Sequence, residues 1–235
     1  MAASGGVAQY QPTKELSLKY SPSRKGGACE ARAFLNPEGE IQREVGHTQD
    51  VPMGIFLHTH AKPLKEDAER FSDIDARGGI GPLVETLTIL EPRLRRLAVH
   101  VIGGVPMVNA DIGLPQMIPV PLMGEGIGRL LSMLLAIYYA QDGVVLIDEV
   151  ENGIHHSALQ MAWRALFHAA TSAQVQLFCT THSWECVRAA EAAASAEPDF
   201  DFSFTRLERL DASITAIQYS HAMLKNALEM DLEVR

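Results

Sequence analysis

Two adjacent carboxylates, Asp148 and Glu149, directly follow an apolar run of the sequence, G-V-V-L-I at 143–147. A run of this kind is typical of a buried strand, and carboxylates at its end are costly to bury unless a cation or hydrogen-bond donors compensate them. Mg²⁺ beside a phosphate group is a natural compensator, because it binds carboxylate oxygens and keeps several waters. We therefore expect Asp148 to hold a magnesium ion through a water molecule and Glu149 to activate an attacking water. An ordinary strand end before a capped helix is the alternative.

A second polar cluster, Thr180-Thr181-His182, follows the next predicted strand, Q-V-Q-L-F-C at 174–179. In open sheets of parallel strands, ligands bind at the carboxyl ends of the strands. A histidine in this position can hydrogen-bond a transferring phosphoryl group or its attacking water. We therefore expect His182 to act beside the two carboxylates. A histidine satisfied within the core is the alternative for this residue taken alone.

Spaced glycines, in the run Gly124-Glu125-Gly126, open an apolar helix predicted over 126–139. Backbone N–H groups at the N-terminus of a helix bind anions, and glycines allow the anion to approach closely. The run lacks the third glycine of the dinucleotide-binding pattern, so it predicts no dinucleotide site. A simple turn is the alternative, because a spaced glycine run is weak support by itself.

These segments belong to an alternation of helix, strand, helix, strand and helix between Gly124 and Ala196. Such alternation predicts a parallel sheet with right-handed crossovers, and therefore an α/β fold. In front of it, the alternating stretch 14–20 and the stretch 29–35 predict a small antiparallel sheet. The predicted organisation is an N-terminal antiparallel β segment at 1–50 and a main part at 51–235, with a helical part at about 63–92, a core at 117–196, and a hairpin and helix at 200–235.

Composition narrows the class of protein. The chain has 235 residues, 47% of them hydrophobic, and 20 basic against 29 acidic residues give a formal net charge of −9. The apolar fraction excludes a disordered chain, and the negative charge gives no support for nucleic-acid binding, although Arg93, Arg95 and Arg96 form a local basic patch. We find no signal-peptide stretch and no apolar run of the roughly 18 residues that a membrane span needs. Three cysteines fit a reducing compartment, so we expect a cytoplasmic protein.

Three strings, L-M-G-E-G-I-G-R-L-L, G-V-V-L-I-D-E-V-E-N-G-I-H-H and Q-L-F-C-T-T-H-S, together resemble the C-terminal half of an ABC-type ATPase. More narrowly, the chain is similar to the AAA_15/AAA_21 family of ATPases, which are related to the overcoming-lysogenization-defect and RecF/SMC-like proteins. The similarity runs from about Val51 to the end of the sequence. It implies a P-loop NTPase-like fold, ATP and Mg²⁺ as cofactors, and a dimer. Within it, Asp148 corresponds to the Walker B aspartate, Glu149 to the catalytic glutamate and His182 to the switch histidine.

The resemblance also implies nucleotide contacts for a further set of residues, namely Gly124, Glu125, Gly126, Arg129, Glu151 and Asn152. The first four form the signature motif, which in this family contacts the γ-phosphate of ATP held by the other subunit. The last two lie in the D-loop position. Two departures accompany these matches: the signature reads G-E-G rather than S-G-G, and His155 stands where transporters have the D-loop aspartate.

One expected motif of the family, G-x-x-x-x-G-K-[ST], has no counterpart in the sequence. It requires a lysine followed by serine or threonine. None of the six lysines meets this requirement, namely Lys14, Lys19, Lys25, Lys62, Lys65 and Lys225. We therefore expect a core without the P-loop strand and helix, which leaves apolar surface uncovered. We also expect weak or no ATP binding by this chain alone, with the Walker A motif supplied by a partner subunit or by a missing N-terminal segment.

Two further functions stay open. A catalytically degenerate ATPase fold would act as a regulatory or binding subunit, and Glu149→Gln would then change nothing. A metal-dependent hydrolase or nuclease would use Asp148, Glu149, Glu151 and His182, but the acidic balance and the lack of a second carboxylate cluster argue against it. The H-T-H stretch at 58–60 offers two metal ligands, without a cysteine or carboxylate partner at a suitable spacing.

Overall fold

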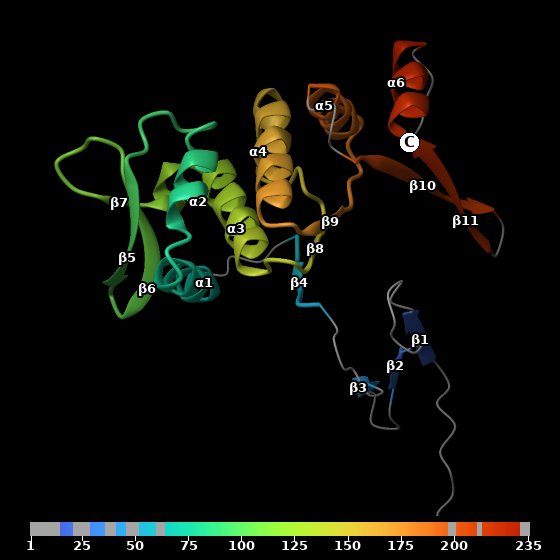
Figure 1. Ribbon diagram of the computed structural model, residues 1–235, viewed down its shortest axis with the longest axis horizontal. Coiled ribbons are helices and arrows are strands. Elements are labelled where there is room, and N and C mark those ends of the chain that lie inside the picture. The colour runs from blue at the N-terminus through green and yellow to red at the C-terminus, as the bar shows by residue number, and fades with distance from the viewer. Residues whose placement is uncertain are drawn as a thin grey trace, which may run out of the picture. The chain divides into compact units, whose positions relative to one another are not determined.

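The computed structural model describes residues 15–20, 29–35, 41–45, 52–59, 64–196, 201–210 and 213–230 of the chain (Figure 1). The chain divides into two units, Met1–Val51 and Pro52–Arg235. Among the described residues, none of the helices combines the length and the apolar character that a membrane crossing requires.

The first unit contains an antiparallel sheet in the order β1-β2-β3, with β1 (Glu15–Tyr20), β2 (Cys29–Leu35) and β3 (Ile41–Val45). The strict alternation in E-L-S-L-K-Y, which favours a strand, is found in β1. β1 pairs with β2 over its whole length, from Glu15 opposite Phe34 to Tyr20 opposite Cys29. The small antiparallel sheet predicted at the front of the chain is therefore confirmed. The segments between its strands lie outside the described residues.

The second unit is built on a parallel sheet in the order β4-β8-β9, with β4 (Gly54–Leu57), β8 (Val144–Ile147) and β9 (Gln176–Cys179). The predicted α/β fold with a parallel sheet is therefore confirmed. Because β8 and β9 run in the same direction, the chain must cross over between them. It does so through the 3-10 turn η2 (His156–Ala158) and α4 (Leu159–Ser172). All three strands end at the same edge of the sheet.

One face of this parallel sheet packs against helices. Val145 of β8 belongs to the same buried core as Leu134 of α3 (Glu125–Tyr139) and Leu166 of α4. α3 is apolar along most of its length and contacts α4 and α1, while α5 (Trp184–Ser195) lies beside α4 (Figure 1). These helices keep water from the buried side of the strands, so the strand ends are held on a rigid base.

The opposite face of the sheet carries an exposed apolar row. Phe56, Leu146 and Phe178 are register partners across β4, β8 and β9, and they are 51%, 42% and 51% exposed. Their strand neighbours Leu57 and Ile147 are only 2% and 1% exposed, because successive side chains of a strand point to opposite faces. Within the described part of the chain, this open apolar row remains in contact with solvent.

The second unit also contains an antiparallel sheet in the order β5-β6-β7, with β5 (Arg96–Ile102), β6 (Val105–Asp111) and β7 (Ile118–Pro119). This sheet packs against α1 (Leu64–Ala76), and α1 also contacts α3 and α2 (Ile80–Leu87). β7 is short because Pro119 and Pro121 have no N–H to donate to a neighbouring strand. The chain therefore continues as the 3-10 turn η1 (Val120–Met123), which leads into α3.

The last part of the second unit is a hairpin followed by a helix. The hairpin is formed by β10 (Ser203–Leu210) and β11 (Ser213–Ser220), which pair antiparallel over their full length. Ser220 caps α6 (His221–Glu229) by accepting from the N–H of Met223 at 3.3 Å. α6 packs on α5 through a small apolar cluster that includes Val187 and Leu224.

Candidate functional site

The three strands of the parallel sheet end at a shared polar cluster. Asp148, the first residue after β8, accepts a hydrogen bond from Thr59, beyond β4, with 2.6 Å between Oγ1 and Oδ2. It accepts a second from Thr180, beyond β9, with 2.7 Å between Oγ1 and Oδ1. These two hydroxyl groups, Thr59 first, hold the pKa of the Asp148 carboxyl below its ordinary value, because they stabilise the charged form. Asp148 therefore stands as an anion between two donors from the neighbouring strands.

Glu149 leaves the strand in a left-handed conformation, with a φ of +46°, which is rare for a residue with a side chain. Thr180 holds the backbone there. Its hydroxyl accepts from the N–H of Glu149 at 3.0 Å, and its carbonyl oxygen accepts from the N–H of Val150 at 3.1 Å. Residues in sparsely populated conformations cost of order 1–3 kcal/mol and cluster at functional sites. Among the described residues, none donates a hydrogen bond to the Glu149 carboxylate.

His182 lies on the exposed side of this cluster. Its backbone N–H donates to Oε1 of Glu151 at 3.1 Å, so the segment after β9 is tied to the segment after β8. Its imidazole, like that of His58, stabilises the Asp148 anion electrostatically, though less than the threonine hydroxyls do. The structure therefore places His182 close to Asp148 and leaves it open to solvent.

Glu151 and Asn152, which occupy the predicted D-loop position, form contacts within the chain. Asn152 donates from Nδ2 to the carbonyl oxygen of Thr59 at 3.2 Å, and Glu151 accepts from His182. The second carboxylate oxygen of Glu151 is buried and has no hydrogen-bond partner in the part of the chain that the structure describes. These bonds link the segments that follow all three strands, whereas a nucleotide contact for Glu151 and Asn152 stays a prediction.

The loop at 124–126 packs against the turn that follows Glu151. Gly124 has a φ of +120° and a ψ of 151°, a conformation that is essentially restricted to glycine. A Cβ at Gly126 would lie 3.0 Å from the carbonyl oxygen of Gly153, and a Cβ at Gly153 would lie 2.9 Å from Cγ of Glu125. The glycines therefore permit a close approach between two segments that the sequence assigns to the site. Gly124 is also the N-cap of α3, where it offers no side chain to the first N–H groups of the helix.

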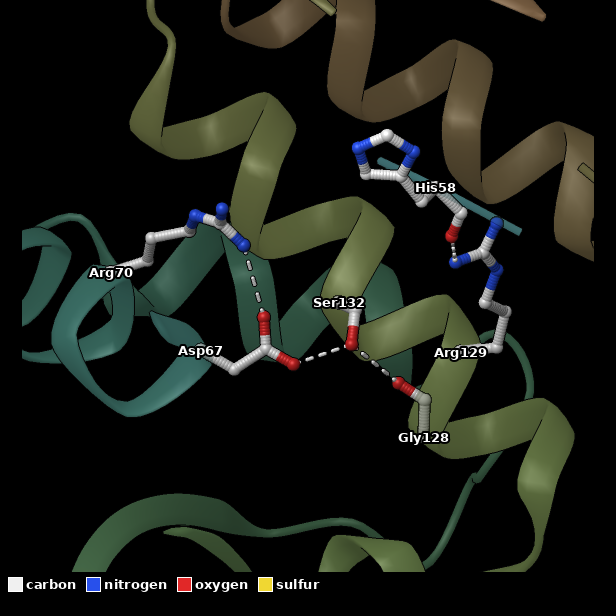
Figure 2. Close-up of polar contacts among 6 residues, drawn as sticks. All are labelled: His58, Asp67, Arg70, Gly128, Arg129 and Ser132. Atoms are coloured by element: carbon white, nitrogen blue, oxygen red, sulfur yellow. Dashed lines mark hydrogen bonds and ion pairs between the residues drawn. The ribbon is translucent and has the colours of Figure 1, made fainter. Parts of the chain in front are cut away.

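Arg129 differs from the other predicted site residues, because its guanidinium is turned into the protein. The residue is 8% exposed, and burial lowers the pKa of the guanidinium from its ordinary value. Nη1 donates to the carbonyl oxygen of His58 and Nη2 to the carbonyl oxygen of Asp148, both at 3.0 Å. Figure 2 shows Arg129 on α3 with its guanidinium directed at the backbone of His58. This arrangement gives no support to the direct nucleotide contact that the family resemblance implies for Arg129.

A buried carboxylate lies between α1 and α3, where no sequence motif indicates one. Asp67 of α1 is 6% exposed. It accepts from Oγ of Ser132, on α3, at 2.5 Å and from Nη1 of Arg70 at 3.2 Å (Figure 2). Burial raises the pKa of Asp67 from the ordinary 3.8 to about 6, although both donors act in the opposite direction. The one signal in the sequence is Ser132 itself, a lone hydroxyl in the apolar stretch L-L-S-M-L-L.

The side chains at the ends of the parallel strands suit Mg²⁺ better than a metal ion that is bound by protein ligands alone. Within the described ranges, no three His, Cys, Asp or Glu side chains are placed to hold a metal ion together. Mg²⁺ needs only one or two carboxylates when waters and phosphate oxygens complete its shell, and the ionised Asp148 meets that need. The metal-dependent hydrolase alternative stays a hypothesis. The histidine pair at 58–60 stays untested, because His60 lies outside the described residues.

A family model described as "AAA domain, putative AbiEii toxin, Type IV TA system" matches residues 40–187. The match spans more than half of the 235 residues and includes the parallel strands together with the segments that follow them. A search of curated proteins finds no match.

Solved structures of Smc heads share the fold of the chain. A crystal structure of an SmcHead bound to the C-winged helix domain of ScpA is 11% identical, with a TM-score of 0.56, and the match covers 92% of this chain and 76% of that one. A crystal structure from Pyrococcus furiosus, of an Smc head with an extended coiled coil bound to the C-terminal domain of ScpA, is 9% identical, with a TM-score of 0.51 and coverage of 88% and 76%. At these identities the likeness concerns the fold alone. The chain belongs to the AAA_21 family, and it is an ATPase-like module with the mixed α/β, P-loop NTPase-like fold of SMC heads.

Proposed function

We propose that this chain binds and hydrolyses ATP with Mg²⁺ as one part of an ABC-type ATPase whose phosphate cradle comes from another segment. The observation that carries this proposal is the Asp148 carboxylate, held between Thr59 and Thr180 where three parallel strands end. Ligands of open α/β sheets bind at this edge. Glu149 is bonded through its backbone to Thr180, and the imidazole of His182 stabilises the Asp148 anion electrostatically. An anion, a proton acceptor and a hydrogen-bonding imidazole are thus available at the ends of the same strands.

Asp148 and Glu149 take different roles because their surroundings differ. Two hydroxyl bonds lower the pKa of Asp148, which makes it a poor proton acceptor and a good partner for a cation. Asp148 would hold Mg²⁺ through a water molecule, and the bound ion would neutralise charge on the phosphate oxygens. Glu149, whose carboxylate the described residues leave unengaged, accepts a proton from the attacking water. His182 hydrogen-bonds an oxygen of the transferring phosphoryl group.

The loop at 124–126 supplies a second set of phosphate contacts in this proposal. Gly124 and Glu125 are exposed, and a helix N-terminus without a capping side chain favours an anion. In a homodimer, the loop of one subunit faces the γ-phosphate of ATP held by the other. Glu151 and Asn152 fix the turn against which this loop packs.

A segment that bears a Walker A motif completes the proposed site. The sequence contains no G-x-x-x-x-G-K-[ST], so a partner subunit or a segment outside this sequence provides the backbone cradle and its lysine. The open apolar row of Phe56, Leu146 and Phe178 supports this, since an exposed patch across three strands is typical of a surface that another element covers. β9 is also an edge strand within the described ranges, and an edge strand can pair with an added strand.

Titration calorimetry with Mg-ATP tests this proposal. We expect weak or no binding by the chain alone, and micromolar binding with turnover when a polypeptide containing a strand, a Walker A motif and a helix is added. In that assembly, Glu149→Gln lowers turnover at least about 100-fold and retains ATP binding, because it removes only the proton acceptor. Glu85→Gln, at an exposed position of α2, is the matched control and leaves turnover unchanged.

Two results would contradict the proposal in different ways. Micromolar binding and turnover by the isolated chain would show that no second segment is needed. Full turnover with Glu149→Gln would remove the catalytic role and favour the regulatory subunit instead.

A further inference from the structure

Arg129 joins the helix that follows the glycine loop to the ends of two strands. It lies near the start of α3, three residues after Gly126. Its guanidinium bridges the carbonyl oxygens of His58 and Asp148, the first residues after the adjacent strands β4 and β8. A guanidinium is planar and its donors have a fixed geometry, so two bonds of 3.0 Å set the spacing between the two backbone segments.

Packing alone does not explain an arginine at this position. Within the described part of the chain, its bonds go to carbonyl oxygens rather than to a carboxylate, and its Nε has no acceptor. The carboxylates of Asp148 and Asp67 stabilise the charge of Arg129 electrostatically, but burial penalises it more. An apolar side chain of similar volume fills such a space at lower cost. The cation therefore has a use other than filling space.

The spacing that Arg129 sets controls the Asp148 carboxylate. His58 directly precedes Thr59, and the Thr59 hydroxyl reaches Oδ2 of Asp148 at 2.6 Å. If the ends of β4 and β8 moved apart, this hydroxyl would lose its acceptor. Asn152 supports the same arrangement from the other side, through its bond to the carbonyl oxygen of Thr59.

α3, the helix that carries Arg129, is itself bonded to α1. Ser132, three residues further along the helix, donates to the buried carboxylate of Asp67 on α1 at 2.5 Å (Figure 2). The helix is thus bonded to α1 through Ser132 and to the strand ends through Arg129. A displacement of the loop at 124–126 would therefore be transmitted to the strand ends.

We propose that Arg129 is a positioning residue. It fixes the ends of β4 and β8 so that Thr59 holds the Asp148 carboxylate in place, and it couples this geometry to the loop at 124–126. The consequence for catalysis rests on the proposed function above, but the geometric effect requires no nucleotide.

Carboxyl ¹³C NMR and amide hydrogen exchange on the chain without nucleotide test this role. Arg129→Met removes the charge and all the hydrogen-bond donors and leaves a shorter, flexible apolar side chain, while Arg129→Lys keeps the charge but has no planar fork. Arg77→Met is the matched control, because Arg77 forms an exposed ion pair with Asp73. The Asp148 resonance, assigned with Asp148→Asn, is compared at neutral pH.

We expect Arg129→Met to move the Asp148 carboxyl resonance and to speed exchange of the Asp148 and Thr180 amides about tenfold or more, as the loss of charge-assisted bonds predicts. Amides of β5 and β6 change less than about twofold, because they lie in another sheet. Arg129→Lys changes both measurements less than Arg129→Met does, and Arg77→Met changes neither measurement.

An unchanged Asp148 resonance in a folded Arg129→Met chain would overturn the proposal. A uniform rise in exchange across both sheets, without a shift of that resonance, would also overturn it, since a merely structural role has this effect. If the methionine variant does not fold, Arg129→Lys decides: a shifted Asp148 resonance supports the proposal and an unshifted one overturns it. Neither readout uses ATP, so a failure of the proposed function is detected separately by calorimetry. In an assembly that hydrolyses Mg-ATP, Arg129→Lys lowers kcat and changes KM less than about twofold.

Discussion

Two aspartates of this chain each accept a short hydrogen bond from a hydroxyl group, yet their pKa values move in opposite directions. Asp148 accepts from threonines at 2.6 and 2.7 Å, and its pKa falls. Asp67 accepts from Ser132 at 2.5 Å and also contacts Arg70, but its pKa rises to about 6. Asp67 is buried between two helices, whereas Asp148 lies half-buried at a sheet edge. Loss of water outweighs the donors at Asp67 and does not at Asp148.

The difference distinguishes a carboxylate that can bind a ligand from one that stabilises the packing of two helices. A carboxylate that stays ionised at an exposed edge can hold a cation, as we propose for Asp148. A carboxylate whose charge is penalised by burial is suited to fixing one helix against another, as Asp67 does through Ser132. Hydrogen bonds alone therefore do not identify the functional carboxylate, because burial decides what they achieve.

The largest expected difference between the two aspartates is in the turnover of variants that remove the charge of one or the other. In an assembly that hydrolyses Mg-ATP, Asp148→Asn lowers turnover at least about 100-fold, because a neutral amide stabilises the cation and the developing charge poorly. Asp67→Asn lowers turnover less than about tenfold, since the bonds of Asp67 to Ser132 and Arg70 lie within α1 and between α1 and α3, and Asp67 acts on the strand ends only indirectly, through Arg129. Steady-state hydrolysis measures both. Equal losses would show that the two carboxylates do not differ in function.

The pH dependence of stability provides the next test. The folded-state pKa of Asp67, about 6, lies above the ordinary 3.8, so the native state binds the proton more tightly than the unfolded state. Its stabilising contribution is present in full below the ordinary value and is lost as pH rises through about 6. Between about pH 4.5 and about pH 7.5, we expect the wild type to lose about 2 kcal/mol relative to Asp67→Asn. Urea titrations at the two pH values measure this difference, and a constant difference would contradict the raised pKa.

A smaller effect is expected from the hydroxyl that bonds Asp67. Ser132→Ala leaves a buried carboxylate without this donor and lowers the free energy of unfolding by about 2 kcal/mol. Ser72→Ala is the control, because Ser72 is an exposed serine of α1 whose hydroxyl, among the described residues, bonds only the carbonyl oxygen of Ala68. We expect it to cost less than about 0.5 kcal/mol. Thermal melts at neutral pH compare the two, and similar costs would mean that Ser132 does not stabilise Asp67.

The smallest expected effect is a change in the pKa of Asp148 when the hydroxyl of Thr59 or Thr180 is removed. Thr59→Val and Thr180→Val each raise the pKa of Asp148 toward its ordinary value, and Thr59→Val raises it more, because Thr59 contributes most to the lowering. Thr59→Ser retains the hydroxyl and leaves the pKa close to that of the wild type. Carboxyl ¹³C NMR titrations follow the change. No change in either valine variant would assign the low pKa to the neighbouring imidazoles instead.

Part of this site could be predicted from local patterns. The apolar runs before Asp148 and Thr180 indicate buried parallel strands, and the ends of such strands meet at one edge. The grouping of Asp148 with the segment that contains His182 follows from that rule. In the structure, Thr180 donates to Asp148 and the N–H of His182 donates to Glu151. The role of Thr59 could not be foreseen, because it depends on the placement of β4 beside β8, which brings Thr59 to Asp148, 89 residues further along the chain.

Arg129 shows a second limit of local patterns. Its place in the motif favours a nucleotide contact, but the direction of its side chain follows from how α3 packs against the ends of β4 and β8. Asp67 is similar, since the stretch K-E-D-A-E-R has the composition of a solvated helix face. Only the burial of that face against α3 changes the chemistry of Asp67.

The order of residues is sufficient to place the strands, the apolar helix α3, the adjacent carboxylates and the absence of a Walker A lysine, because each depends on neighbours along the chain. The three-dimensional arrangement settles which charges are exposed, which are bonded and to what. It distinguishes Asp148 from Asp67, turns Arg129 inward and leaves the row of Phe56, Leu146 and Phe178 open. The reason is physical: desolvation and hydrogen bonding act between groups that are close in space, and most of these partners lie far apart in sequence.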